Sequence, residues 1–206
     1  MEINAQFGQL ADQATVDATA AALTNNGITT LVVDSGAEAK AKVLELLPEG
    51  AEVMNMTSMT LEGISVVKEI LESTRYASVR KKLNALDQEK DDREMRCLGA
   101  APAWVVGSVH AVTRAGQILV ASNTGSQLPA YAYGAQHVIW VIGTHKLVKN
   151  MEEGIKRLYE YSLPREDERA RKVYGVGSGV SKILVVNKEL AAGRITAILV
   201  QEKLGF

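Results

Sequence analysis

The chain has 206 residues, of which 47% are hydrophobic and 23% charged, and its formal net charge is -1. This length suits one domain, 1–206, with a sizeable core. The near-neutral charge argues against a nucleic-acid partner, and no apolar run reaches the roughly 18–20 residues that a membrane span needs. Residues 1–5 lack the basic and apolar regions of an export signal, so we expect a cytoplasmic protein.

The first part of the chain alternates between helical and strand patterns. Residues 10–23 are alanine-rich with apolar positions at helical spacing, and Asn25-Asn26-Gly27 is typical of a helix end. Residues 28–33 form a β-branched apolar run, as expected of a buried strand. The same reasoning predicts a helix at 38–47, a strand at 51–56 and a helix at 61–71. Such alternation is typical of a parallel sheet flanked by helices.

The second part continues the alternation with one exception. Residues 79–97 are strongly charged, which predicts one or two solvated helices on the sheet, with a partner-docking surface as the alternative. After a strand that begins at Trp104, the apolar segments 109–113 and 117–121 flank Arg114-Ala115-Gly116 and predict a hairpin inserted in the parallel sheet. The remaining predicted elements are helices at 131–135, 151–161 and 165–172 and strands at 137–142, 183–187 and 195–201. We therefore expect an α/β three-layer sandwich with a mostly parallel sheet and an antiparallel hairpin.

Charge spacing in the predicted helix 151–161 indicates an exposed face. Glu152 and Lys156, and Glu153 and Arg157, stand four residues apart, where opposite charges on a helix surface attract.

Few residues in the chain suit a metal or a dinucleotide. Cys97 is the only cysteine and is expected to be a buried small hydrophobe, so any iron–sulfur cluster would belong to a partner chain. His110, His137 and His145 lack metal-ligand spacing, and we expect no metal site and no cofactor in this chain. The glycines of 175–179 precede a strand instead of opening a helix, which favours a flexible connector over a Rossmann loop.

The densest polar segment is 122–127, which follows a strand and precedes a helix that Pro129 can begin. Free N–H groups at a helix start attract a carboxylate or phosphate, although simple helix capping explains the same residue types. Thr57 and Ser58 lie at a similar strand-to-helix junction. The candidate ligand-binding residues are Thr57, Ser58, Thr113, Ser122, Asn123, Thr124, Gly125, Ser126 and Gln127. His110 and Glu62 are the candidate catalytic residues, because either can act in acid–base chemistry.

Residues 107–113 and 121–128, read together, resemble the core of the LUD domain, the domain of lactate-utilisation protein C and its relatives. The resemblance continues through 139–148, 163–171 and 193–206. It implies a fold like those of ribose-5-phosphate isomerase, glucosamine-6-phosphate deaminase and CoA transferases. It also implies a link to the oxidation of lactate to pyruvate beside iron–sulfur partner subunits. Arg114 departs from the pattern, because relatives often carry an acidic residue there.

These observations lead to a functional hypothesis with two alternatives. The chain is expected to bind a small anionic metabolite and to assist lactate oxidation together with iron–sulfur oxidoreductase subunits. One alternative is a stand-alone enzyme acting on a phosphorylated or CoA-linked metabolite, which rests on fold analogy alone. The other is a non-catalytic interaction module that docks through residues 79–97. The sequence is compatible with a homo-oligomer.

Overall fold

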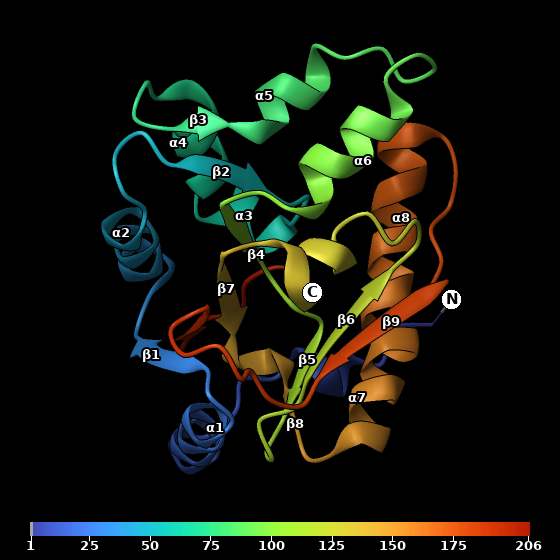
Figure 1. The fold of residues 1–206 in the computed structure, drawn as a ribbon. Helices are drawn as coiled ribbons and strands as arrows, with labels where there is room; N and C mark the ends of the chain where they lie inside the picture. Colours follow the sequence, from blue (N-terminus) through green and yellow to red (C-terminus); the bar gives the residue numbers. More distant parts are fainter. Residues whose placement is uncertain (1) are drawn as a thin grey trace.

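A computed structural model describes residues 2–206 and arranges them in two β-sheets surrounded by helices (Figure 1). The strands of the larger sheet are β1 (Thr29–Val33), β2 (Glu52–Asn55), β3 (Ala77–Ser78), β4 (Trp104–Gly107), β7 (His137–Gly143) and β10 (Ile195–Val200). They lie in the order β1-β10-β7-β4-β2-β3, and each neighbouring pair is parallel. The predicted α/β class is confirmed.

Both faces of the larger sheet are covered, which explains why its strands are apolar at successive positions. In β10, Ala197 and Leu199 join one core cluster, and Ile198 and Val200 join the other. The first face packs against α1 (Gln13–Asn25) and α5 (Val79–Asn84), and the second against α2 (Gly36–Leu46), α3 (Met59–Gly63) and α4 (Val66–Glu72). The helix predicted at 61–71 is interrupted, because Ser65 adopts the left-handed conformation with φ 57° between α3 and α4.

The predicted hairpin forms, but its predicted position inside the parallel sheet is wrong. Its strands β5 (Ala111–Thr113) and β6 (Ile118–Ser122) belong to a second sheet with β8 (Leu147–Val148) and β9 (Lys182–Val186), in the order β8-β5-β6-β9. The chain leaves the larger sheet at Ser108, whose hydroxyl donates to the backbone carbonyl of Val141 at 2.7 Å. The small sheet then packs on the same face as α1 and α5.

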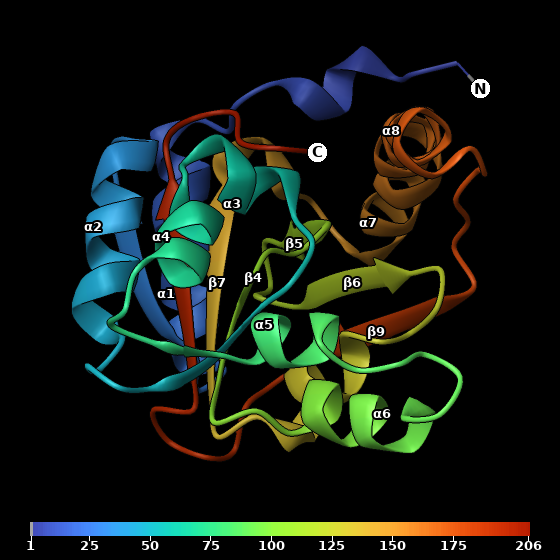
Figure 2. The ribbon, with the colours of Figure 1, turned by 90° about the horizontal axis from the view of Figure 1, so that it is seen from above.

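One long helical run covers the outer face of the small sheet (Figure 2). It consists of α7 (Met151–Arg157), a π-helical turn (Leu158–Ser162) and α8 (Leu163–Tyr174), and it ends at Gly175 with φ 74°. The predicted exposed pair Glu152–Lys156 is present at 2.9 Å. The companion prediction for Glu153 and Arg157 is wrong, because Arg157 is fully buried beneath this helix.

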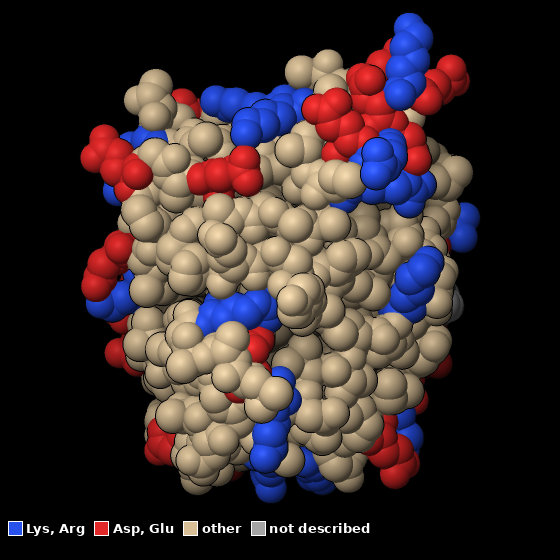
Figure 3. Space-filling model, in the orientation of Figure 1, with Lys and Arg blue, Asp and Glu red and all other residues tan. Residues whose placement is uncertain are grey.

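The charged region before β4 forms solvated helices, as predicted. Its second helix, α6 (Asp92–Ala100), carries exposed charges while Met95 and Leu98 pack on the core. Acidic and basic side chains are interspersed over α6 and the loop before it (Figure 3). Cys97 lies on this helix and is exposed, so the expectation of a buried thiol is wrong. No helix within residues 2–206 is both long and apolar enough to cross a membrane.

A close contact at the end of β4 requires glycine. A Cβ atom added to Gly107 would lie 1.7 Å from the hydroxyl oxygen of Tyr131, whose buried ring meets Trp140 edge-on at a centroid distance of 5.4 Å. We expect Gly107→Ala to lower the free energy of unfolding by about 1–3 kcal/mol, because the buried ring has no free space to move into. Urea denaturation measures this loss.

The matched control is Gly99→Ala in α6, where an added Cβ atom meets nothing within 4 Å. This change should be neutral or stabilising by up to about 1 kcal/mol, since alanine is the better helix former. Equal losses for the two variants would show that the contact with Tyr131 does not constrain the fold.

Candidate functional site

Three polar side chains meet at the carboxyl-terminal edge of the larger sheet. Lys146 follows β7, and its Nζ atom donates to Thr60 Oγ1 at 2.9 Å and to Ser108 Oγ at 3.0 Å. Thr60 lies in α3 after β2, and Ser108 follows β4, so the ends of three parallel strands supply the group. Ligands of open α/β sheets bind at this edge. We call these three residues the lysine site.

The lysine site is buried and its hydrogen bonds have a fixed direction. Lys146 is 1% exposed. Thr60 Oγ1 donates to the carbonyl of Leu204 at 2.9 Å, and Ser108 Oγ donates to that of Val141, so both hydroxyl oxygens accept from the amine. Burial, and next the charge of Arg157, hold the pKa of Lys146 well below its ordinary value.

A second group of cations gathers around the ring of Tyr161 in the helical run. The guanidinium carbons of Arg157 and Arg165 lie 4.9 and 4.7 Å from the ring centroid, and Lys203 Nζ lies 5.8 Å from it. A Cβ atom added to Gly8 would stand 2.8 Å from both Lys203 Nζ and Tyr161 Oη, so a residue without a side chain borders this group. We call Arg157, Arg165 and Lys203, with Tyr161, the arginine cluster.

Arg157 joins the arginine cluster to the rest of the site. Its Nη1 atom donates to Ser162 Oγ at 3.0 Å and to the carbonyl of His110, and its Nε atom donates to the carbonyl of His145 at 3.4 Å. Its Nη2 atom is buried without a hydrogen-bond partner within residues 2–206. Burial lowers the pKa of Arg157 to about 9, so this guanidinium remains charged at neutral pH.

Further buried polar atoms around Arg157 also lack partners in the described part of the chain. They are Tyr161 Oη, Arg165 Nε and both ring nitrogens of His145. His145 is 2% exposed, and its ring meets that of Tyr161 edge-on at 6.5 Å. Burial, then the charges of Lys146, Arg157 and Lys203, lower the pKa of His145. Buried polar groups are normally hydrogen-bonded, so this concentration marks a place for a ligand or ordered water.

The basic side chains of the site have no carboxylate partners in the described part of the chain. Among residues 2–206, no Asp or Glu forms an ion pair with Lys146, Arg157, Arg165 or Lys203. A buried unpaired cation is costly, whereas an anion that enters such a site gains the full attraction of charges that are already desolvated.

His110, a predicted catalytic residue, adjoins the arginine cluster, because its backbone carbonyl accepts from Arg157 Nη1. Its Nδ1 atom accepts the N–H of Ala121 at 3.1 Å, so the ring proton of the neutral form is on Nε2. Burial, followed by the charges of Lys146 and Arg157, lowers its pKa to about 3. His110 is therefore neutral at physiological pH and suited to donate a hydrogen bond from Nε2.

The structure does not bring the other predicted catalytic residue, Glu62, into the lysine site. Glu62 is exposed on α3, and Thr57 is exposed before it, while Ser58 Oγ accepts the N–H of Leu61 as the helix cap. Thr113 is buried in the hairpin, where its Oγ1 atom accepts the N–H of Gln117 at 3.1 Å. Roles for these four residues in binding or catalysis stay predictions.

The predicted ligand loop 122–127 uses most of its polar groups internally. Ser122 Oγ accepts the N–H of Gly125 at 2.8 Å and donates to Gln127 Oε1 at 2.9 Å, and Thr124 bonds with Ser126 at 3.2 Å. Asn123 Oδ1 accepts from Ser181 Oγ at 3.2 Å. These bonds fit the capping alternative, and ligand binding by Ser122, Asn123, Thr124, Gly125, Ser126 and Gln127 stays a prediction. Next to the loop, the N–H of Ala121 in β6 donates to His110 Nδ1 at 3.1 Å.

Sequence reasoning missed the residues that make the site unusual, namely Lys146, Arg157, Tyr161, Arg165 and Ser108. One signal was available for Lys146, because His145-Lys146 follows at once after the most apolar strand and so falls at a sheet edge. Arg114, where the chain departs from the family pattern, donates to Thr15 Oγ1 of α1 at 3.1 Å. That contact places it against α1.

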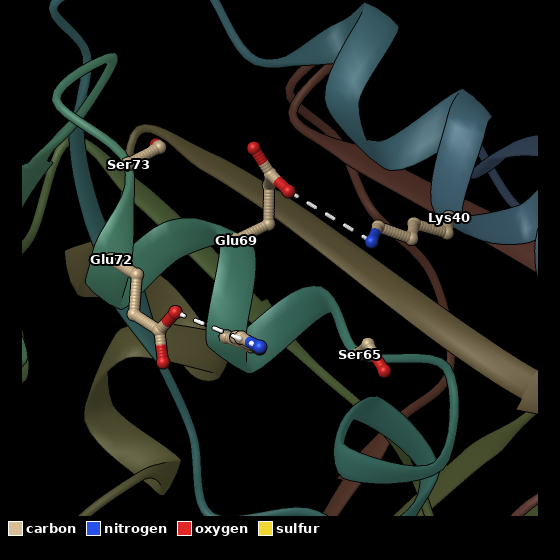
Figure 4. A pocket seen from close by; sticks show the side chains of 6 residues that line it. Lys40, Ser65, Glu69, Glu72 and Ser73 are labelled. Carbon is tan, nitrogen blue, oxygen red and sulfur yellow. Dashed lines mark ion pairs between the residues drawn. The ribbon is translucent and has the colours of Figure 1, made fainter.

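A hollow between α2 and α4 is lined by Lys40, Ser65, Lys68, Glu69, Glu72 and Ser73 (Figure 4). Its lysines pair with its glutamates, Lys40 with Glu69 and Lys68 with Glu72, each at 3.8 Å, so no excess charge draws a ligand there. Residues 2–206 contain no group of three or more His, Cys, Asp and Glu side chains placed to hold a metal ion.

The lowered pKa of Lys146 predicts how stability depends on pH. Between that pKa and the ordinary value of 10.5, the unfolded chain binds a proton that the folded chain does not, so stability should rise with pH. Lys146→Met should remove up to about 1.4 kcal/mol per pH unit from this slope. Denaturant unfolding from about pH 7 to about pH 10 measures it. The exposed Lys149→Met is the control, and equal slopes in all three proteins would mean that folded Lys146 is charged.

Comparisons with known proteins agree with this architecture. A profile of the LUD domain matches residues 16–200. The fold is similar to the crystal structure of a DUF162-family protein from Deinococcus radiodurans, with 12% identity over 93% of this chain and 99% of that chain and a TM-score of 0.54. No curated protein sequence matches the chain. Since the profile covers most of the chain, from α1 to the end of β10, the protein belongs to the LUD domain family.

Proposed function

We propose that the chain binds a small anionic metabolite, a carboxylate or a phosphate, between the arginine cluster and the lysine site. The observation that carries this proposal is the set of cations without carboxylate partners around Tyr161. Arg157 is fully buried and keeps one nitrogen, Nη2, without a partner in the described chain. A guanidinium matches the two oxygens of a carboxylate or phosphate, and such charge-assisted bonds are the strong ones.

The surrounding groups suit a small acid that carries a hydroxyl or carbonyl group on the carbon next to its anionic group. The arginine cluster would hold the anionic group, with Lys203 as its outermost cation, because Lys203 is exposed whereas Arg157 is buried. His110 Nε2–H can donate to a hydroxyl or carbonyl oxygen, since Nδ1 is occupied by Ala121. This arrangement can bind, orient and polarise a short hydroxy acid or oxo acid.

Family membership narrows the first ligands to test. We propose that the ligand is lactate or pyruvate and that the chain assists lactate oxidation beside partner subunits with iron–sulfur clusters. In that scheme the electrons pass to the partners, and this chain holds the acid and excludes water. A stand-alone enzyme acting on a phosphorylated or CoA-linked metabolite would use the same cations for phosphate, so inorganic phosphate and CoA esters belong in the test.

The test is calorimetric titration of the full chain with lactate, pyruvate, inorganic phosphate and a CoA ester. We expect Arg165→Gln to weaken the binding of the preferred anion at least about tenfold, or about 1.4 kcal/mol, because a charge-assisted contact is lost. Lys188→Gln, at an exposed lysine outside the arginine cluster, should leave the dissociation constant unchanged.

A third variant tests whether the ligand binds at the arginine cluster or at the predicted loop. The combined change Ser122→Ala, Thr124→Ala and Ser126→Ala should leave binding within about twofold, because those hydroxyls bond with one another and with their own loop. Loss of binding in the loop variant with full binding in Arg165→Gln would move the site to the loop. No binding of any of the four ligands would contradict the proposal.

A further inference from the structure

The hydrogen bonds of the lysine site have fixed directions that limit how many protons Lys146 can share, and anion binding alone does not depend on this limit. Thr60 and Ser108 direct their hydroxyl protons to the carbonyls of Leu204 and Val141, so each oxygen can only accept from Lys146. The amine therefore gives one N–H to each hydroxyl. Within residues 2–206 the Nζ atom has no third hydrogen-bond partner, so an ammonium would leave one proton unsatisfied in a buried place. A neutral amine satisfies both bonds and leaves its lone pair free.

We infer that Lys146 is a nucleophile that condenses reversibly with the carbonyl group of a 2-oxo acid. A desolvated lysine with a free lone pair is the form that adds to carbonyl carbon. This inference rests on the proposed function, because the arginine cluster would hold the carboxylate while the adjacent carbonyl carbon meets Nζ. It names the ligand class as a 2-oxo acid, since a 2-hydroxy acid or phosphate offers no electrophilic carbonyl.

The reaction balances without an oxidant or a reductant. The lone pair of Nζ forms a bond to the carbonyl carbon, and the carbonyl oxygen receives a proton from nitrogen, which gives a carbinolamine. The carbon–oxygen bond then breaks, and the oxygen leaves as water with the second amine hydrogen. The product is an imine, and the addition of water reverses every step.

Access to Nζ depends on the segment 203–206, which lies over Thr60. Leu204 accepts the hydroxyl proton of Thr60, and a Cβ atom added to Gly205 would stand 2.6 Å from Thr60 Oγ1. Figure 2 shows the carboxyl terminus beside α3, the helix that carries Thr60. In this inference a ligand reaches Lys146 by displacing this segment.

Reductive trapping tests the inference on the full chain. The protein is incubated with pyruvate and cyanoborohydride, and the modified residue is found by intact mass and peptide mapping. We expect one reduced pyruvyl group per chain, on Lys146, formed at least tenfold faster than on the exposed Lys149. Lactate with cyanoborohydride should give no adduct, and Lys146→Met should remove the fast labelling by pyruvate.

Each result decides between the two proposals. Fast labelling of Lys146 in the wild-type protein supports the inference even if the Lys146→Met chain fails to fold. Pyruvate and lactate that bind equally in the titration, with labelling absent from Lys146 or spread over exposed lysines, would overturn the imine and leave anion binding intact. Absence of both binding and labelling would overturn both proposals.

Discussion

The structure depends on a buried positive charge whose hydrogen bonds go to backbone carbonyls. Arg157 holds the carbonyl of His110, where the chain passes between the two sheets, and that of His145, in the turn after β7. One guanidinium thus fixes the small sheet, the end of the large sheet and the helical run relative to one another. Charged hydrogen bonds of this kind stabilise more than neutral ones, but the charge itself remains uncompensated by any acid of the described chain.

The same arrangement explains the unusual state of its neighbours. Arg157 keeps its proton because the guanidine group is by far the strongest base present. Its positive charge disfavours the protonated forms of neighbouring groups that lose protons more easily. His110 and Lys146 both have lowered pKa values, mainly through burial. For His110 the charges of Lys146 and then Arg157 lower the pKa further, and for Lys146 the charge of Arg157 does so. The site therefore combines a fixed cation with a neutral imidazole and an amine whose pKa is lowered. Hydroxyl groups at the ends of neighbouring strands complete it, and no acidic residue of the described chain forms an ion pair with it.

Much of the fold could be predicted from the sequence, because the runs 137–142 and 195–201 are largely apolar on both faces, as central strands are, and the β-branched run 28–33 forms the edge strand β1. The hairpin could be predicted from its loop, Arg114-Ala115-Gly116. Its place in the second sheet could not, because the hydrogen bond from the Ser108 hydroxyl to a carbonyl marks where the chain leaves the larger sheet. The site was harder to predict. Arg157 stands four residues after Glu153, the same spacing as in exposed helical ion pairs, so the sequence pattern predicts exposure. Its burial results from packing against a sheet whose strands are distant in sequence. The pattern of loop 122–127 predicts ligand binding as readily as helix capping, because both use the same residue types.

The lysine site joins segments that are far apart along the chain. Lys146 bonds to Thr60 across 86 positions, and Thr60 bonds to Leu204 across 144. Contacts between segments so distant in sequence carry a large loop-closure entropy, and topologies rich in them are typical of slow folding. A fragment that lacks either α3 or the segment after β10 cannot form this series of hydrogen bonds, because Thr60 and Leu204 each supply one member of it. The lysine site is therefore a property of the whole assembled sheet and of no single segment of the chain.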